Sequence, residues 1–334
     1  MKNILFIIIF LSLAAVAVAQ PKSQRRIYLW DVTLSMKGYG GTPDIYSDVV
    51  KFLEKQIEGI TDENTEIVVL PFQERILARW AVRADAAGKE GIIREIKNYQ
   101  NGNITNTDIV NPVRDVMANI IKPDKNNLLI LLTDGEQSEK LGGKAELTRL
   151  IEQWGSYAGE NFAYCLYVAL VPGIVPEDIE KEIEKAECID VIEPDGVKNF
   201  ELIDLQPAEL VVKVNIKEDK TAKIPLNYNK SVALPENIKI KITAQDSILN
   251  IDQTVMVQEG KIAFDMKYKS DYQTLKKQLS ENTRLPLQIE LINKKEIENA
   301  TGKIVTLTNN NIELELINRP EKTLKITVRK EEKR

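Results

Sequence analysis

The segment RIYLWDVTLSMKGYG, residues 26–40, joins a short apolar run to a group of small polar residues. The run RIYLWDV is typical of a buried β-strand. Directly after it, Asp31, Thr33 and Ser35 occupy alternate positions, and glycines follow. One interpretation is an ordinary polar turn in which Asp31 caps the next element. The other is a set of cation ligands, because hard divalent cations prefer carboxylate and hydroxyl oxygens.

Strand and helix patterns alternate from this segment to about residue 203. The run NLLILLTDG (residues 127–135) is an apolar strand that ends near Asp134, and DIYSDVVKFLEKQIEGI (residues 44–60) carries a helical apolar stripe. Alternation of this kind predicts a mostly parallel sheet that is covered by helices on both faces. We therefore predict a Rossmann-like α/β domain over residues 26–203.

The pattern changes near Pro207, where the apolar period becomes two. Runs such as VVKVNIK (211–217), IKIKITA (238–244) and IELELI (312–317) alternate apolar with polar residues. Half-buried antiparallel strands have this alternation. We therefore predict a second domain over residues 208–334, an antiparallel β-sandwich of the Ig-like type.

The N-terminal residues have the features of a targeting segment. Residues 1–20, MKNILFIIIFLSLAAVAVAQ, have a basic residue, an apolar stretch and an Ala-x-Ala end. These features predict a signal peptide over residues 1–19 that is cleaved after Ala19, followed by a linker over 20–25. An uncleaved anchor is the alternative, and the Ala-x-Ala end favours cleavage. No later segment is apolar enough to span a membrane. The signal peptide, in a chain without glycosylation-rich or cysteine-rich character, leads us to expect a periplasmic or extracellular bacterial protein.

Composition excludes several function classes. The 45 basic and 50 acidic residues give a net charge of −5, which offers no electrostatic footprint for nucleic acid. The chain contains no histidine, which excludes Ser-His and Cys-His catalysis and His-based zinc sites. An exported chain meets an oxidising compartment. The sequence leaves open whether Cys165 and Cys188 form a disulfide or remain two separate thiols.

Three polar loops are expected to meet at one edge of the α/β sheet. Ligands of such sheets bind at the carboxyl ends of the strands. One loop follows the first strand, one follows NLLILLTDG, and NGNITNTD (residues 101–108) precedes a helix. The candidate ligands are Asp31, Thr33, Ser35, Thr105, Thr107, Asp108 and Asp134. Each loop alone could be a turn or a helix cap, but their coincidence favours a cation site for Mg²⁺, with Mn²⁺ or Ca²⁺ as alternatives.

The motifs DVTLSMKG, TNT and LTDGE resemble the metal-ion-dependent adhesion site of von Willebrand factor type A (vWA) domains. The resemblance implies that Asp31, Thr33, Ser35, a loop threonine and Asp134 bind the cation. Thr33 occupies a place where the family usually has serine. Thr105 is the best match for the loop threonine, and Thr107 competes with it. Thr107 and Asp108 are alternative ligands or supporting residues.

The resemblance also implies a function. In the family, the hydroxyls contact the ion directly and the aspartates act partly through water, so an open position takes an Asp or Glu carboxylate from a protein partner. The protein would then be a non-enzymatic binding protein. One alternative is a metal-free scaffold, because the Thr33 methyl group could crowd the ion. The other is a metal-dependent phosphatase with Asp31 as nucleophile, although Thr33 stands where that chemistry needs a second aspartate.

Overall fold

The computed structural model describes residues 23–100, 104, 106–186, 188–193, 201–216, 219–228, 232–279, 282–308 and 311–317. The signal peptide predicted for residues 1–19 and the first part of the linker lie outside the described residues. The first strand begins at Gln24. Among the described residues, none of the helices combines the length and the apolar character needed to cross a bilayer.

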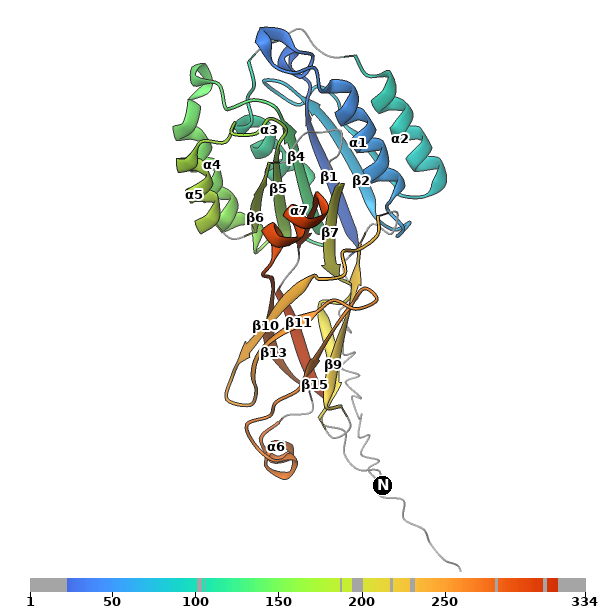
Figure 1. The fold of residues 1–334 in the computed structure, drawn as a ribbon, viewed down its shortest axis with the longest axis vertical. Coiled ribbons are helices and arrows are strands. Elements are labelled where there is room, and N and C mark those ends of the chain that lie inside the picture. The colour runs from blue at the N-terminus through green and yellow to red at the C-terminus, as the bar shows by residue number, and fades with distance from the viewer. Residues whose placement is uncertain are drawn as a thin grey trace, which may run out of the picture.

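The N-terminal half contains a six-stranded sheet with the order β3-β2-β1-β4-β5-β6 (Figure 1). All neighbouring pairs are parallel except the edge pair β2–β3, which is antiparallel. The mostly parallel α/β sheet expected from the sequence is thus present. Its strands are β1 (Gln24–Asp31), β2 (Glu66–Phe72), β3 (Trp80–Arg83), β4 (Asn126–Thr133), β5 (Ala163–Ala169) and β6 (Ile189–Ile192).

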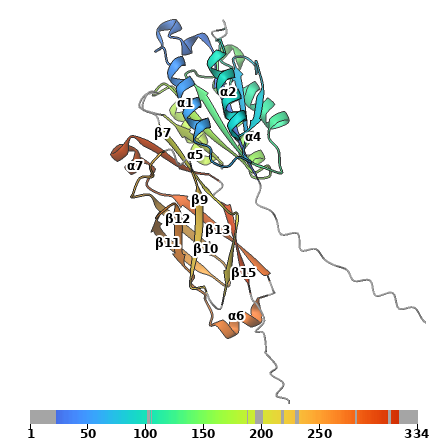
Figure 2. The same ribbon diagram turned by 90° about the vertical axis from the view of Figure 1, so that its right-hand side faces the viewer.

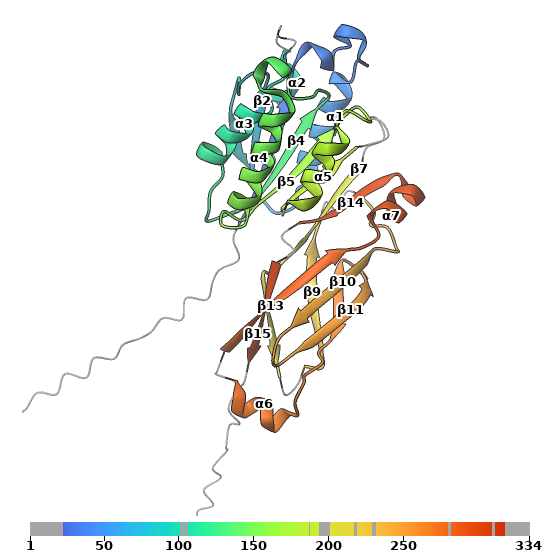
Figure 3. The same cartoon turned by 90° about the vertical axis from the view of Figure 1, so that its left-hand side faces the viewer.

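Helices cover both faces of this sheet (Figures 1 and 3). Successive side chains of a strand point to opposite faces, and β1 is buried on both. Tyr28 and Trp30 pack under one helical layer, whereas Ile27 and Leu29 pack under the other. The first layer is α1 (Tyr46–Glu58) and α2 (Ala86–Asn98). The second is α3 (Val110–Asp115) with a π-helical turn (Val116–Ile120), α4 (Gly143–Ala158) and α5 (Glu177–Lys185).

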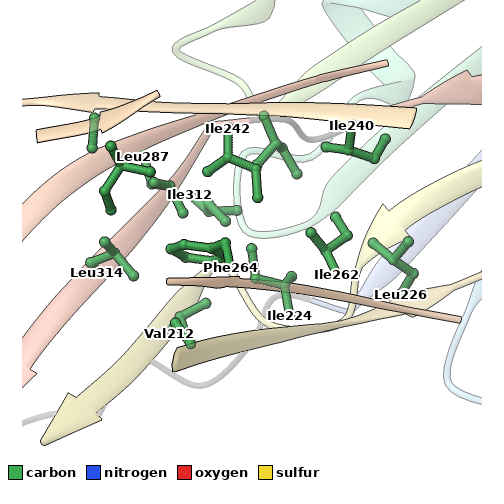
Figure 4. Packing of buried hydrophobic residues seen from close by; sticks show 14 of the residues in the cluster. Val212, Ile224, Leu226, Ile240, Ile242, Ile262, Phe264, Leu287, Ile312 and Leu314 are labelled. Carbon is green, nitrogen blue, oxygen red and sulfur yellow. The ribbon is translucent and has the colours of Figure 1, made fainter. Parts of the chain in front are cut away.

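The C-terminal half consists of two sheets that enclose one apolar core (Figures 2 and 4). The five-stranded sheet has the order β11-β10-β13-β15-β8, and the four-stranded sheet has the order β12-β9-β7-β14. Their strands are β7 (Glu201–Pro207), β8 (Val211–Asn215), β9 (Thr221–Asn227), β10 (Lys239–Gln245), β11 (Asn250–Met256), β12 (Lys261–Asp265), β13 (Asn282–Leu291), β14 (Lys303–Leu307) and β15 (Asn311–Ile317). Two helices, α6 (Tyr272–Gln278) and α7 (Lys294–Thr301), connect strands.

Strand direction in these sheets differs from the expectation. Most pairs are antiparallel, but β7 pairs with β14, and β8 with β15, in parallel. The expectation of purely antiparallel strands was therefore wrong for these two pairs. The physical reason is that alternation reports which face of a strand is buried, not the direction of its neighbour. The paired strands are also far apart along the chain, so no hairpin sets their direction.

Strand β7 lies between the two halves of the molecule and contributes to both cores. Leu202 is buried in the core under α1 and α2, whereas Ile203 and Leu205 are buried in the core of the C-terminal half. Asp204 forms a buried ion pair with Arg26 of β1 at 3.6 Å. The predicted boundary between residues 203 and 208 falls within this strand, and the contact between the halves is a packed interface.

The two cysteines lie on neighbouring strands. The backbone N–H of Cys165 donates to the carbonyl of Cys188 at 2.9 Å, next to the β5–β6 pairing. Both residues are thiols in the structure, so it does not contain the disulfide that the sequence left open. Cys165 is buried in the sheet core, and Cys188 is half-buried with a left-handed backbone.

Candidate functional site

The first candidate loop follows β1 and is held by buried anchors. Met36 is fully buried, and its carbonyl accepts the backbone N–H of Ile45. Leu34 to Met36 form a short 3₁₀ turn, and Gly38 then adopts a left-handed backbone with φ 79°. A side chain at Gly38 would also approach the Thr42 carbonyl at 3.2 Å. The loop therefore turns back sharply and leaves Thr33 and Ser35 beside the end of β1.

Asp31 is the centre of the hydrogen-bond network and is fully buried. Its Oδ1 accepts the backbone N–H and the hydroxyl of Thr33 at 2.9 and 2.8 Å. Its Oδ2 accepts the hydroxyl of Thr133 at 2.6 Å and that of Thr107 at 3.5 Å. Both carboxylate oxygens are thus oriented by hydroxyls, which come from two loops and from the end of β4.

A chain of oxygen atoms leads from Asp31 to Asp134. The Thr33 hydroxyl lies 2.8 Å from Asp31 Oδ1 and 2.9 Å from the Ser35 hydroxyl. The Ser35 hydroxyl in turn lies 2.9 Å from Asp134 Oδ1. The residues that the sequence placed at i, i+2 and i+4 therefore do meet, and Asp134 joins them from the end of β4.

This chain has fewer protons than contacts when both carboxylates are ionised. It contains three oxygen–oxygen contacts, but the two hydroxyls supply only one proton each. If Thr33 donates to Asp31 and Ser35 donates to Asp134, the two hydroxyl oxygens face each other with lone pairs. Either a proton on a carboxyl group or a cation that accepts these lone pairs would resolve the conflict.

The raised pKa values of the two carboxyl groups also indicate that a proton or a cation is favoured at this site. Burial raises the pKa of Asp31, against the hydrogen bonds from Thr133 and Thr33. Burial, and then the nearby charge of Asp31, raise the pKa of Asp134 to about 7. Asp134 Oδ2 is buried and has no hydrogen-bond partner among the described residues. Two desolvated carboxylates whose charges repel each other favour the uptake of positive charge, either protons or a metal ion.

The third loop contributes Thr107. This side chain is buried, donates toward Asp31, and packs so closely on Gly135 that an added Cβ there would lie 2.9 Å from the Thr107 hydroxyl. Thr105 lies outside the described residues. Asp108 is also buried, but its Oδ1 accepts the backbone N–H of Asn111 at 3.2 Å and its Oδ2 accepts the Asn111 amide at 2.6 Å. The Asp108 carboxylate therefore caps the start of α3.

The site lies at the end of the molecule that faces away from the C-terminal half, where the loop after β1 stands at the top of Figure 1. Ser35 is half-exposed, whereas Asp31 and Thr33 beneath it are fully buried. Tyr39, on the same loop, has 62% of its surface exposed. The geometry is that of a buried oxygen cluster with one accessible side.

Two participants were missed by the sequence interpretation. Thr133 makes a short hydrogen bond to Asp31, and Gln137 connects the loop after β4 to the start of α3. Thr133 immediately precedes Asp134, so its position at the strand end was a usable signal. Among the described residues, no group of three or more His, Cys, Asp or Glu side chains could hold a metal ion. Any cation at this site would therefore depend on hydroxyl oxygens as well as the two carboxylates.

Comparison with known proteins gave matches to solved structures only. No protein-family model matches the chain, and no curated protein does so either. Proximal thread matrix protein 1 from the mussel byssus is 16% identical with a TM-score of 0.41, and the match covers 59% of this chain and 54% of that one. The chain thus spans about half the length of the mussel protein.

Two bacterial structures also match. A von Willebrand factor type A protein from Catenulispora acidiphila is 13% identical, with a TM-score of 0.41 over 81% of this chain and 63% of that one. The conserved hypothetical protein BatB from Bacteroides thetaiotaomicron is 12% identical, with a TM-score of 0.35 over 52% of this chain and 91% of that one. A vWA structure is therefore among those that this chain resembles, as its motifs led us to expect.

Proposed function

We propose that this protein is an exported vWA-like binding protein that engages a protein partner through a divalent cation. The observation that carries the proposal is the oxygen chain between Asp31 and Asp134, which is one proton short when both carboxylates are ionised. Asp134 Oδ2 is also buried without a hydrogen-bond partner in the part of the chain that the structure describes. A cation among these oxygens would accept the lone pairs and compensate the two buried charges. The residues present therefore fit a metal ion.

The donor set favours Mg²⁺, with Mn²⁺ or Ca²⁺ as alternatives, because every donor is a hard oxygen. The hydroxyls of Thr33, Ser35 and a loop threonine would hold the ion together with Asp31 and Asp134. The contact of Thr107 with Asp31 and Gly135 supports Thr107 as the loop ligand. The bound ion would supply an electrophilic centre, since only two of these donors carry a formal charge.

The proposed partner presents an Asp or Glu carboxylate. Ser35 is the accessible member of the site, and it lies at an end of the molecule that the C-terminal half does not cover. The exposed ring of Tyr39 stands on the same loop and would offer an apolar contact beside the carboxylate. A protein segment with an acidic side chain next to an apolar one would match both features.

Binding is favoured over catalysis by the state of Asp31. A nucleophilic carboxylate needs an oxygen that can reach the substrate, but Asp31 is fully buried and both its oxygens accept hydrogen bonds. We therefore do not assign it a phosphatase role. Export rests on the predicted signal peptide over residues 1–19, and we propose the periplasm or cell surface as the location. The C-terminal half, proposed to be Ig-like, would present the site.

The direct test is calorimetric titration of Mg²⁺ and Mn²⁺ into mature protein that a chelator has stripped of metal. Native protein is expected to bind one ion, and Asp31→Ala is expected to lose binding. Glu136→Ala is the matched control, because this acidic side chain is exposed and lies two residues from Asp134. The control should bind as native protein does.

The outcomes separate the candidate functions. Binding that is lost in Asp31→Ala and kept in Glu136→Ala supports the cation site and justifies a search for the acidic partner. Absence of binding in native protein would contradict the proposal and leave the metal-free scaffold. Metal-dependent turnover of phosphate esters by native protein would instead favour the hydrolase.

A further inference from the structure

Gln137 connects two of the loops that form the proposed site, although it lies outside the motifs that the sequence suggested. Its side chain is buried, with 4% of its surface exposed. The side-chain oxygen accepts the backbone N–H groups of Ile109 and Val110 at 2.6 and 3.2 Å. These N–H groups belong to the start of α3, where backbone donors have no partner within the helix. The loop after β4 therefore caps the helix that follows Thr107.

The side-chain nitrogen of Gln137 is equally occupied. It donates to Asp108 Oδ1 at 3.1 Å and to the carbonyl of Leu141 at 3.1 Å. An amide has two donor hydrogens and one oxygen with two lone pairs, so all of its capacity is used. The orientation of the amide is also fixed, because two N–H groups face one end and two acceptor oxygens face the other.

Ser138 reinforces the same connection. Its backbone N–H donates to the Thr107 carbonyl at 3.0 Å, and its hydroxyl accepts the Thr107 N–H at 3.1 Å. Ser138 therefore holds the backbone of Thr107, Gln137 holds the three residues that follow it, and the Thr107 side chain packs on Gly135. These contacts fix the backbone on both sides of Thr107, whose hydroxyl lies 3.5 Å from Asp31 Oδ2.

We infer that Gln137 is a positioning residue that places the Thr107 hydroxyl for the cation. This inference rests on the proposed function, since it assigns a role toward the ion of that same site. Gln137 donates and accepts only within the two loops and is not a proposed ligand. Its removal should weaken metal binding through Thr107. Supporting partners of metal ligands typically contribute about 10- to 100-fold to affinity.

The test uses Mn²⁺ alone as the probe, in full-length mature protein, with two measurements. Titration gives the affinity, and water-proton relaxation gives the number of waters that contact the ion. Gln137→Met keeps the size of the side chain but loses the four hydrogen bonds. It is expected to bind Mn²⁺ about tenfold more weakly and to gain one water, because water replaces the misplaced threonine hydroxyl. Thr107→Val, which lacks the hydroxyl, should gain the same additional water as Gln137→Met.

Controls distinguish positioning from general destabilisation. Leu287→Ala opens a cavity in the apolar core of the C-terminal half, away from both loops (Figure 1), so it should lower stability without changing the affinity or the water count. Gln137→Glu keeps an acceptor oxygen but loses the donor beside Asp108, and should weaken binding as well. If Gln137 acts only through Thr107, the double variant Gln137→Met/Thr107→Val should bind no more weakly than Thr107→Val alone.

The result that overturns the inference is a Gln137→Met variant with native affinity and a native water count, or a double variant whose losses add. Either result would leave the proposed function intact, because native protein would still bind the ion. Failure of native protein to bind Mn²⁺ would instead overturn the proposed function and the role of Gln137 together.

Discussion

Replacing Asp134 with asparagine is expected to stabilise the metal-free protein, and increasingly so as the pH rises. In the native protein, Asp134 is buried beside Asp31 and its pKa is raised to about 7. Asparagine has nearly the same shape and no charge. Its amide can donate to the Ser35 hydroxyl, which lets Ser35 donate to Thr33 and Thr33 to Asp31. All three contacts of the oxygen chain then have a proton.

The magnitude follows from the pKa difference. The ordinary pKa of an aspartate carboxyl is 3.8, and the folded value is about 7. Each pKa unit corresponds to about 1.4 kcal/mol, so ionising Asp134 in the folded state costs about 4 kcal/mol more than in the unfolded chain. Because the folded pKa is the higher one, the unfolded chain releases its proton first. The contribution of the Asp134 carboxyl group to the free energy of unfolding is therefore fully present below pH 3.8. It is lost as the pH rises to about 7, and it changes little above that pH.

Urea unfolding in the presence of a chelator measures this effect. The quantity to follow is the free energy of unfolding of Asp134→Asn minus that of native protein. We expect this difference to increase by about 3 to 4 kcal/mol between pH 4 and pH 8. Taking the difference cancels the titration of groups that both proteins share. Added Mg²⁺ should stabilise native protein, by about 2.7 kcal/mol at a hundred times its dissociation constant, and leave the variant unchanged.

A difference that stays constant across this pH range would refute the reasoning. It would mean that Asp134 is not ionised against a desolvation cost, and that the buried carboxylates do not need a cation to compensate their charge. A variant that is less stable than native protein at pH 8 without metal would refute it more directly. Retained stabilisation of the variant by Mg²⁺ would show that the ion binds elsewhere.

Two further predictions concern the site and the junction between the halves. Gly135→Ala should weaken Mn²⁺ binding about tenfold in a titration, because the added Cβ would meet the Thr107 hydroxyl at 2.9 Å, whereas Gly91→Ala in α2, where the Cβ has open space, should bind normally. Asp204→Ala should lower the free energy of urea unfolding by about 3 to 5 kcal/mol, since it leaves Arg26 buried without its partner, and adding Arg26→Met should recover part of the loss. Equal metal binding by the two glycine variants, or an Asp204→Ala variant of native stability, would contradict these expectations.

Much of the α/β half could be predicted because its strands are apolar on both sides. The run around Leu129 and Leu131 can be buried only in a covered, mostly parallel sheet. Because the carboxyl ends of parallel strands lie at one edge of a sheet, Asp31 and Asp134 could be assigned to one site from the sequence. Their bridge through Ser35 follows from adjacent strands, since β1 pairs directly with β4.

The remaining features depend on contacts between distant loops, which spacing does not encode. The choice between Thr105 and Thr107 as the loop ligand depends on how the third loop packs against Gly135. The residue that packs against Gly135 is Thr107. Gln137 could not be singled out from the sequence, because three of its four hydrogen-bond partners, Asp108, Ile109 and Val110, lie in another segment. The parallel pairing of β8 with β15 was missed since period-two patterns carry no direction.

Because β7 contributes residues to both cores, it limits where the chain can be divided into fragments. Leu202 completes the core of the N-terminal half, while Ile203, the next residue, completes the core of the other. A fragment that stops before residue 201 would expose the apolar surface that Leu202 covers, and one that starts there would lose the Arg26 partner of Asp204. Strand β7 also pairs with β9 and β14, so a protease could cut within it only after these pairings had opened. Neither half thus has a complete core without β7. Recombination that moved one half without this strand would transfer an incomplete core.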